Sequence, residues 1–227
     1  MTLSRAARLA IFVGLLGVAV ALVILTVADF LRASPPRVNF AAGHRAGQPV
    51  ELRLQTVGSI GFGVHPTWVS YLVQNPEGKW VHTTIWQLPA NTRIDVTIDQ
   101  YDSGSPLRNQ QIGLVTGTSG NQESTNGKAV SLVDSNSGNG VGHTFSVPSL
   151  GINVPLAGID ANASNMCSVA PCDAKSARTT VKFSFTTPGP GQYPWQCFVP
   201  CGVGYLFGNG GPMQTVGYMD GFLEVVA

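Results

Sequence analysis

The hydrophobic pattern changes character once along the chain. From Leu9 to Ala28, twenty consecutive residues carry no charge and most of them are apolar. At about 1.5 Å of rise per residue, a helix of this length spans a hydrocarbon core of about 30 Å. The pattern therefore predicts one N-terminal membrane helix.

Charges beside this run predict its orientation. Arg5 and Arg8 precede it, which favours a cytoplasmic N-terminus and an extracytoplasmic C-terminal domain, although Arg32 and Arg37 beyond it weaken the bias. A cleaved signal peptide is the alternative, but its apolar region is usually only about 7 to 15 residues long. We therefore expect a single-pass protein of the cell membrane, in contact with membrane lipid.

Beyond Ala28 no helical period is evident, and the pattern alternates every two residues. Short alternating or β-branched runs bounded by Gly, Pro and Asn turns are typical of strands. The strands expected on this basis are Glu51–Val57, Trp68–Val73, Lys79–Trp86, Arg93–Ile98, Thr180–Phe185 and Gly221–Val226. Many short strands predict an all-β sandwich or barrel.

The expected organisation has three parts: residues 1–32 as cytoplasmic N-terminus and membrane helix, 33–38 as a Pro-containing linker, and 39–227 as an extracytoplasmic domain. The polar stretch Ser103–Gly142 is long for a loop of a compact domain. Short strands are expected within it, around Gln111–Val115 and at Ala129–Val133.

Composition narrows the function. The formal net charge is +1 and only 11% of residues are charged, well below the roughly 25% usual for soluble proteins. No basic patch indicates a nucleic-acid partner. The chain has no Gly-x-Ser-x-Gly or His-Glu-x-x-His motif and no phosphate-binding glycine loop, so catalysis by this chain alone is not expected.

Three segments contain the residues best suited to redox chemistry. The first begins Gly142-His143-Thr-Phe-Ser-Val-Pro-Ser-Leu-Gly. The second, which begins at Pro188, reads Pro-Gly-x-Gly-x-Tyr-x-x-x-Cys-x-x-x-Cys-Gly and contains Cys197 and Cys201. The third is Met219-x-Gly-x-Leu-x-Val. Copper that cycles between Cu(I) and Cu(II) uses thiolate, imidazole and a weak thioether, and these segments supply all three.

In composition and order, the three segments resemble the copper-binding strands and loop of cytochrome c oxidase subunit II, over about Leu88–Val226. The resemblance implies a cupredoxin-like Greek-key β-sandwich or barrel, with one N-terminal membrane helix as in the one-helix forms of that family. It implies copper, as one or two ions. The implied ligands are His143, Cys197, Cys201, Met219 and the backbone carbonyl of Val199.

The chain departs from the family at one ligand. A second His normally follows Cys-Gly-x-x, but here Tyr205 occupies that region, and no His follows His143. A phenol oxygen is a poor ligand for Cu(I), so Tyr205 is expected to be a filler. The methionine also comes late in the chain. Met219 has the Met-x-Gly context, but Met213 remains an alternative.

Each candidate also has a structural interpretation. His143 could be a hydrogen-bonded core histidine, and Cys197 and Cys201 could form a disulfide outside the cytoplasm. Cys167 and Cys172 have no copper-like context, so a disulfide that closes a loop is expected for them. Trp195 is either a core residue or lies near an electron route.

Two classes of function follow. The first is a membrane-anchored copper electron-transfer protein, a subunit II-like component of a terminal haem-copper oxidase. It would accept electrons from an external donor, such as cytochrome c or a small copper protein, and pass them to a membrane oxidase core subunit. The alternatives are a copper-free cupredoxin subunit with a structural or docking role in a respiratory complex, and a mononuclear blue or red copper protein.

Overall fold

A computed structural model describes residues 4–32, 35–104, 106–201 and 211–227. The chain divides into two compact units, Met1–Ser34 and Pro35–Ala227. Tyr205, considered above as a filler, lies outside the described residues.

The first unit contains one helix, α1 (Arg5–Arg32). The hydroxyl of Ser4 caps its start by accepting a hydrogen bond from the backbone N–H of Ala7 (3.2 Å). The segment Arg5–Ala28 is long and apolar enough to cross a membrane, and none of its apolar window is buried within the structure. A signal sequence has the same properties, so the membrane anchor itself stays a prediction.

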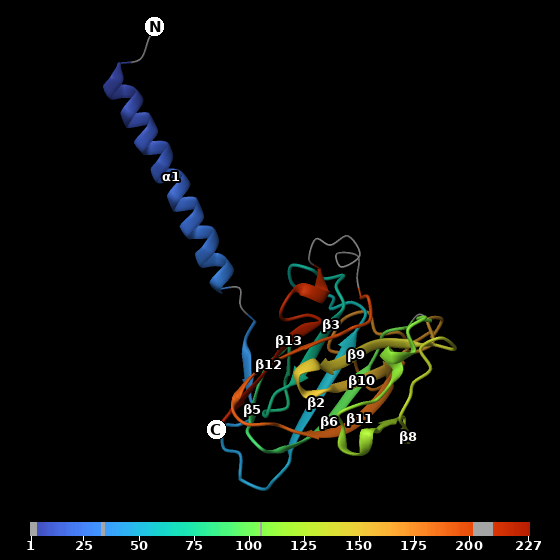
Figure 1. The fold of residues 1–227 in the computed structure, drawn as a ribbon. Helices are drawn as coiled ribbons and strands as arrows, with labels where there is room; N and C mark the ends of the chain where they lie inside the picture. Colours follow the sequence, from blue (N-terminus) through green and yellow to red (C-terminus); the bar gives the residue numbers. More distant parts are fainter. Residues whose placement is uncertain (1–3, 33–34, 105, 202–210) are drawn as a thin grey trace. The chain divides into compact units, whose positions relative to one another are not determined.

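The second unit is built of β-strands in two sheets (Figure 1). Among the described residues, one sheet has six strands in the order β1-β5-β13-β12-β9-β10, and the other has seven in the order β4-β3-β2-β6-β11-β7-β8. The strands of the first sheet are β1 (Arg37–Asn39), β5 (Ile85–Pro89), β9 (Val141–Val147), β10 (Ile152–Ala157), β12 (Gly191–Gln196) and β13 (Asp220–Val226). Those of the second are β2 (Val50–Val57), β3 (Ser70–Gln74), β4 (Trp80–Val81), β6 (Arg93–Gln100), β7 (Glu123–Thr125), β8 (Lys128–Val130) and β11 (Thr179–Thr186). The all-β, two-sheet class predicted for a cupredoxin-like sandwich is confirmed.

Alternation explains how the sheets form the core. In β6 the residues Ile94, Val96 and Ile98 are buried, while the residues between them are partly exposed. β13 repeats the same pattern. Trp86 and Trp195 from the six-stranded sheet stack at 5.0 Å between ring centroids inside this core. Burial of the apolar faces of both sheets stabilises the fold.

Two predicted strands are wrong in detail. Around Gln111–Val115 the chain forms a 3-10 turn, Gln110–Gly113, because the Asn109 side chain accepts a hydrogen bond from the Gln111 N–H (3.0 Å) and turns the backbone. The single strand predicted at Lys79–Trp86 is two strands, β4 in one sheet and β5 in the other. The Thr83 hydroxyl there bonds the carbonyl of Pro36. The chain passes from one sheet to the other between β4 and β5, and the alternation of polar and apolar residues does not indicate this change.

Candidate metal centre

His143 lies on β9, a strand whose residues are all buried. β9 pairs with β10 along its length and with β12 through Ser146 and Gln196. This central position excludes water from the imidazole, which is only 1% exposed. The sheet therefore holds the imidazole ring where it has almost no contact with water.

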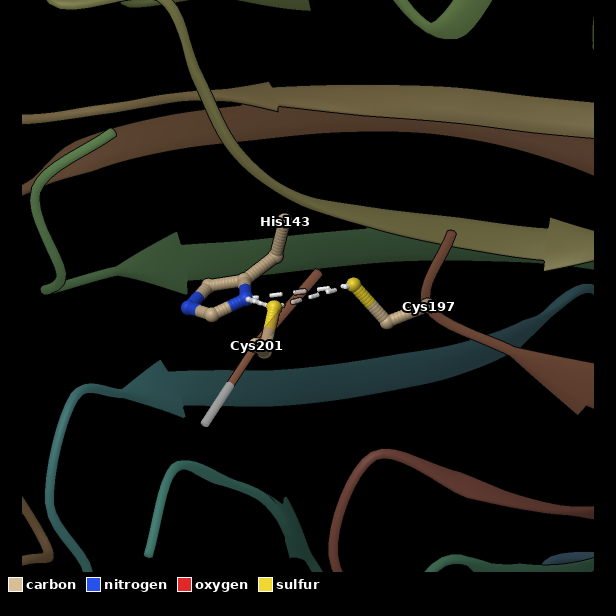
Figure 2. Close-up of side chains that lie close together, drawn as sticks. All are labelled: His143, Cys197 and Cys201. Carbon is tan, nitrogen blue, oxygen red and sulfur yellow. Dashed lines mark hydrogen bonds between the residues drawn. The ribbon is translucent and has the colours of Figure 1, made fainter. Parts of the chain in front are cut away.

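Cys197 and Cys201 follow the end of β12, and their side chains point toward the imidazole of His143 (Figure 2). Three hydrogen bonds fix the start of this segment. The N–H of Cys197 donates to the carbonyl of Met219 (2.9 Å), the N–H of Phe198 donates to the hydroxyl of Thr144 (2.8 Å), and the N–H of Thr144 donates to Sγ of Cys197 (3.3 Å). The segment is thus tied to β9 and to the start of β13.

The donor atoms of these three residues form a compact triangle. Nδ1 of His143 lies 3.0 Å from Sγ of Cys201 and 3.9 Å from Sγ of Cys197, and the two sulfur atoms are 3.6 Å apart. A point equidistant from all three atoms lies about 2 Å from each, close to metal–nitrogen and metal–sulfur bonds of about 2.0 to 2.3 Å. Both thiols are free in this structure. The donors therefore fit a metal ion that prefers soft ligands.

The other predicted ligands are buried, and each has a main-chain contact to the end of β12 or to the loop after it. The carbonyl oxygen of Val199 is 3.7 Å from Sγ of Cys197, so the loop directs it toward the sulfur atoms. Met219 is fully buried, and its backbone contacts Cys197 as described above. Met213 is also buried, and its carbonyl accepts a hydrogen bond from the side chain of Gln196 (2.7 Å). The preference for Met219 over Met213 as the thioether ligand stays a prediction.

The glycine of the Met-x-Gly motif has a structural role. A Cβ atom on Gly221 would lie 2.0 Å from the carbonyl oxygen of Thr84. That oxygen accepts hydrogen bonds from the indole of Trp195 (3.1 Å) and from the N–H of Phe222 (3.0 Å). The close approach of these strands therefore requires glycine at this position.

Sequence reasoning missed one residue of the site. Oδ2 of Asp102, just beyond the end of β6, lies 3.1 Å from Nε2 of His143. Nε2 is the nitrogen that faces away from the two thiols. An aspartate in a polar segment after a strand has no local motif. β6 and β9 belong to different sheets, so only the packing of the two sheets could reveal this contact.

The close contacts shift the pKa values of all three candidate ligands. Burial lowers the pKa of His143, but hydrogen bonds to Asp102 and Cys197 outweigh it and raise the value to about 9. Burial likewise opposes ionisation of Cys197, yet hydrogen bonds from Cys201 and His143 and the imidazolium charge lower the pKa of this thiol. The hydrogen bond to Cys197 and burial raise the pKa of Cys201. The metal-free site thus favours one thiolate beside one imidazolium.

Other predicted residues have structural roles. Cys167 and Cys172 form the predicted disulfide, with their Cα atoms 5.7 Å apart. Trp195 is 1% exposed and packs against Tyr71, Trp86 and Phe145, which supports the core interpretation.

The other histidines do not join the site. His65 stacks on Trp68, with ring centroids 3.7 Å apart, and His82 bonds Ser70. His44 bonds the carbonyl of Gln48. Within the described residues, the one His/Cys/Asp/Glu group arranged to hold a metal is His143, Cys197 and Cys201.

No protein-family model matches the chain, and no curated protein matches it. Among solved structures it is similar to rusticyanin from Thiobacillus ferrooxidans, with a TM-score of 0.32 and 15% identity over 89% of this chain and 94% of that chain. A Met-to-Leu variant of rusticyanin gives a TM-score of 0.35 and 16% identity over 86% and 84% of the two chains. A further rusticyanin structure, described as a copper protein, gives 0.34 and 14% over 89% and 94%. Because these scores are low, we base the assignment of the metal centre on its own residues.

Proposed function

We propose that this chain is a membrane-anchored copper protein that transfers electrons. The observation that carries the proposal is the triangle of one imidazole nitrogen and two thiol sulfurs, all buried and within 3.9 Å of one another. Imidazole and thiolate are the donors that copper uses in both of its common oxidation states.

Bound copper would supply one-electron redox chemistry. The chain's own residues would provide the conditions for it. His143, Cys197 and Cys201 would hold the copper, with the carbonyl of Val199 and one of the two methionines as weaker candidate ligands. The hydrogen bonds to Cys197 and Phe198 hold the loop before any ligand arrives, so little atomic movement would accompany a change of charge. Burial excludes water from the donors.

The finer assignment rests on the sequence resemblance. We propose that the protein is a subunit II-like component of a terminal haem-copper oxidase, anchored by α1 with its β domain outside the cytoplasm. An external donor, such as cytochrome c or a small copper protein, would reduce it, and a membrane oxidase core subunit would oxidise it. The apolar length of α1 supports the anchor.

A mononuclear copper site is the second candidate, and a specific observation favours it. The chain has one histidine in the three motif segments, and the three donor atoms share one point at bonding distance. A pair of coppers held by two bridging thiolates would need further terminal ligands, and the chain lacks the second imidazole. The number of copper ions per chain therefore distinguishes a subunit II-like site with two coppers from a mononuclear copper site.

The test is copper content per chain, measured together with the visible absorption spectrum, on the full chain in detergent after loading under reducing conditions and reoxidation. We expect intense thiolate-to-copper bands, with one or two ions per chain. Cys197→Ser should abolish these bands. The double variant Cys167→Ser/Cys172→Ser is the matched control and should retain them. A wild-type chain that stays colourless and metal-free would refute electron transfer and favour the copper-free structural subunit.

A further inference from the structure

We propose that Asp102 is a positioning residue that fixes the orientation of His143, and that Gln100, Thr56 and two glycines are arranged to hold Asp102 in place. The inference deepens the proposed function and rests on it, because the orientation matters for a metal that binds Nδ1. Apart from one of the glycines, Gly142, none of these residues belongs to the three sequence motifs.

The first observation is the division of labour between the two ring nitrogens of His143. Nε2 faces Oδ2 of Asp102 at 3.1 Å, while Nδ1 faces both sulfur atoms. A carboxylate that accepts a hydrogen bond from Nε2–H fixes the ring orientation and leaves the Nδ1 lone pair for a metal. A rotated ring would remove both contacts at once.

The second observation is that Asp102 is itself held at several atoms. Its Oδ1 accepts a hydrogen bond from the N–H of Ser103 (2.8 Å), and its carbonyl accepts one from the N–H of Ile159 (3.0 Å). The side chain of Gln100 brackets its backbone, with Oε1 accepting from the Asp102 N–H and Nε2 donating to the Asp102 carbonyl, each at 3.0 Å.

Gln100 is anchored in turn. The hydroxyl of Thr56, on the neighbouring strand β2, donates to Oε1 of Gln100 (2.7 Å). Both side chains are fully buried. The Gln100 amide oxygen accepts two hydrogen bonds and its nitrogen donates one, so these contacts favour one rotamer and link Thr56 through Gln100 to Asp102.

The third observation is the space left for these side chains. A Cβ atom on Gly58 would lie 2.5 Å from Oδ1 of Asp102, and a Cβ on Gly142 would lie 2.2 Å from Nε2 of Gln100. Neither glycine needs a positive φ, so the close approach of these side chains is what requires glycine here. Gly142 directly precedes His143, which links the position of the ligand strand to that of Gln100.

The test compares Cu(I) affinity of the full chain, measured by competition with a chromophoric Cu(I) chelator. We expect Asp102→Ala to weaken Cu(I) binding about 10- to 100-fold, the usual cost of removing a carboxylate that orients a metal-binding histidine. Asp102→Asn should lie between Asp102→Ala and wild type, because its single amide oxygen can serve His143 or Ser103 but not both. Asp95→Asn, the same change on the outer face of β6, is the matched control and should bind like wild type.

Two further measurements separate outcomes. Gly58→Ala keeps the aspartate but displaces it, so it should weaken Cu(I) binding even if Asp102→Ala fails to fold. In metal-free protein with ¹⁵N-labelled histidine, the Nε2 proton of His143 should exchange slowly with water, and Asp102→Asn should accelerate that exchange.

Unchanged Cu(I) affinity in folded Asp102→Ala and Gly58→Ala would overturn the positioning role and leave the copper proposal intact. If wild type binds no copper, the proposed function fails, and the exchange measurement alone decides the role of Asp102. Equal exchange rates in wild type and Asp102→Asn would then overturn that role.

Discussion

The two cysteine pairs of this protein have nearly the same spacing but different oxidation states. Cys167 and Cys172 are five residues apart and form a disulfide, whereas Cys197 and Cys201 are four apart and remain free thiols 3.6 Å from each other. What differs is the surroundings. His143 lies beside the free pair, with Asp102 on the far side of its ring, whereas Sγ of Cys167 lies 3.5 Å from the carbonyl of Val169. Spacing within a loop thus does not decide cysteine chemistry, but neighbouring strands do.

The largest effect should come from removing the imidazole. We expect His143→Gln to weaken copper binding by more than about 100-fold, because a direct donor is lost and not only a group that orients it. In the metal-free protein the pKa of Cys197 should rise, since the hydrogen bond and charge of His143 now lower it. The ultraviolet absorbance of the thiolate against pH measures this shift. An unchanged pKa of Cys197 would mean that His143 is not what distinguishes the free thiols from the disulfide pair.

The pH dependence of stability that arises at Glu123, away from both cysteine pairs, provides a reference for effects at the metal site. Glu123 on β7 is 3% exposed. Its Oε1 accepts a hydrogen bond from Thr125, and its Oε2 has no partner among the described residues. Burial raises the pKa of Glu123 to about 7. A raised folded-state pKa stabilises the fold below the unfolded value near 4.5, and this stability is lost as pH rises toward 7.

The corresponding loss of unfolding free energy is at most about 3 to 4 kcal/mol, at about 1.4 kcal/mol per pKa unit. Denaturant unfolding of metal-free protein at pH 5 and pH 8 measures it. Glu123→Gln should reduce the difference between the two pH values. A difference that persists in full would assign the pH dependence to the metal-site residues instead.

The smallest effect should come from the disulfide. Opening its short loop with Cys167→Ser/Cys172→Ser should lower the free energy of unfolding by about 2 kcal/mol, the loop-entropy estimate for a closure of this length. Guanidinium unfolding checks the value. Copper content should not change, because these residues contact none of the candidate ligands. If the double variant also lost its copper, the disulfide loop and the metal centre would be structurally coupled and not independent regions.

Much of the fold followed from alternation. The strands containing Arg93–Ile98 and Thr180–Phe185 were predicted within two residues at each end, because one face of each is buried against the other sheet. The turn at Asn109 and the crossing after Val81 were not predicted. There a side-chain hydrogen bond, or a change of sheet, overrides the local pattern. Neither depends on the period of hydrophobic residues.

The sequence by itself determined the apolar N-terminal segment, the all-β class and the donor types at His143, Cys197 and Cys201. These follow from local composition, periodicity and motif, which need no knowledge of the chain's path. Only the tertiary structure decided that the three donors converge, that the thiols are free and that Asp102 stands behind the imidazole. His143 and Asp102 are 41 residues apart, and their contact depends on how the ends of β6 and β9 come together in the packed domain.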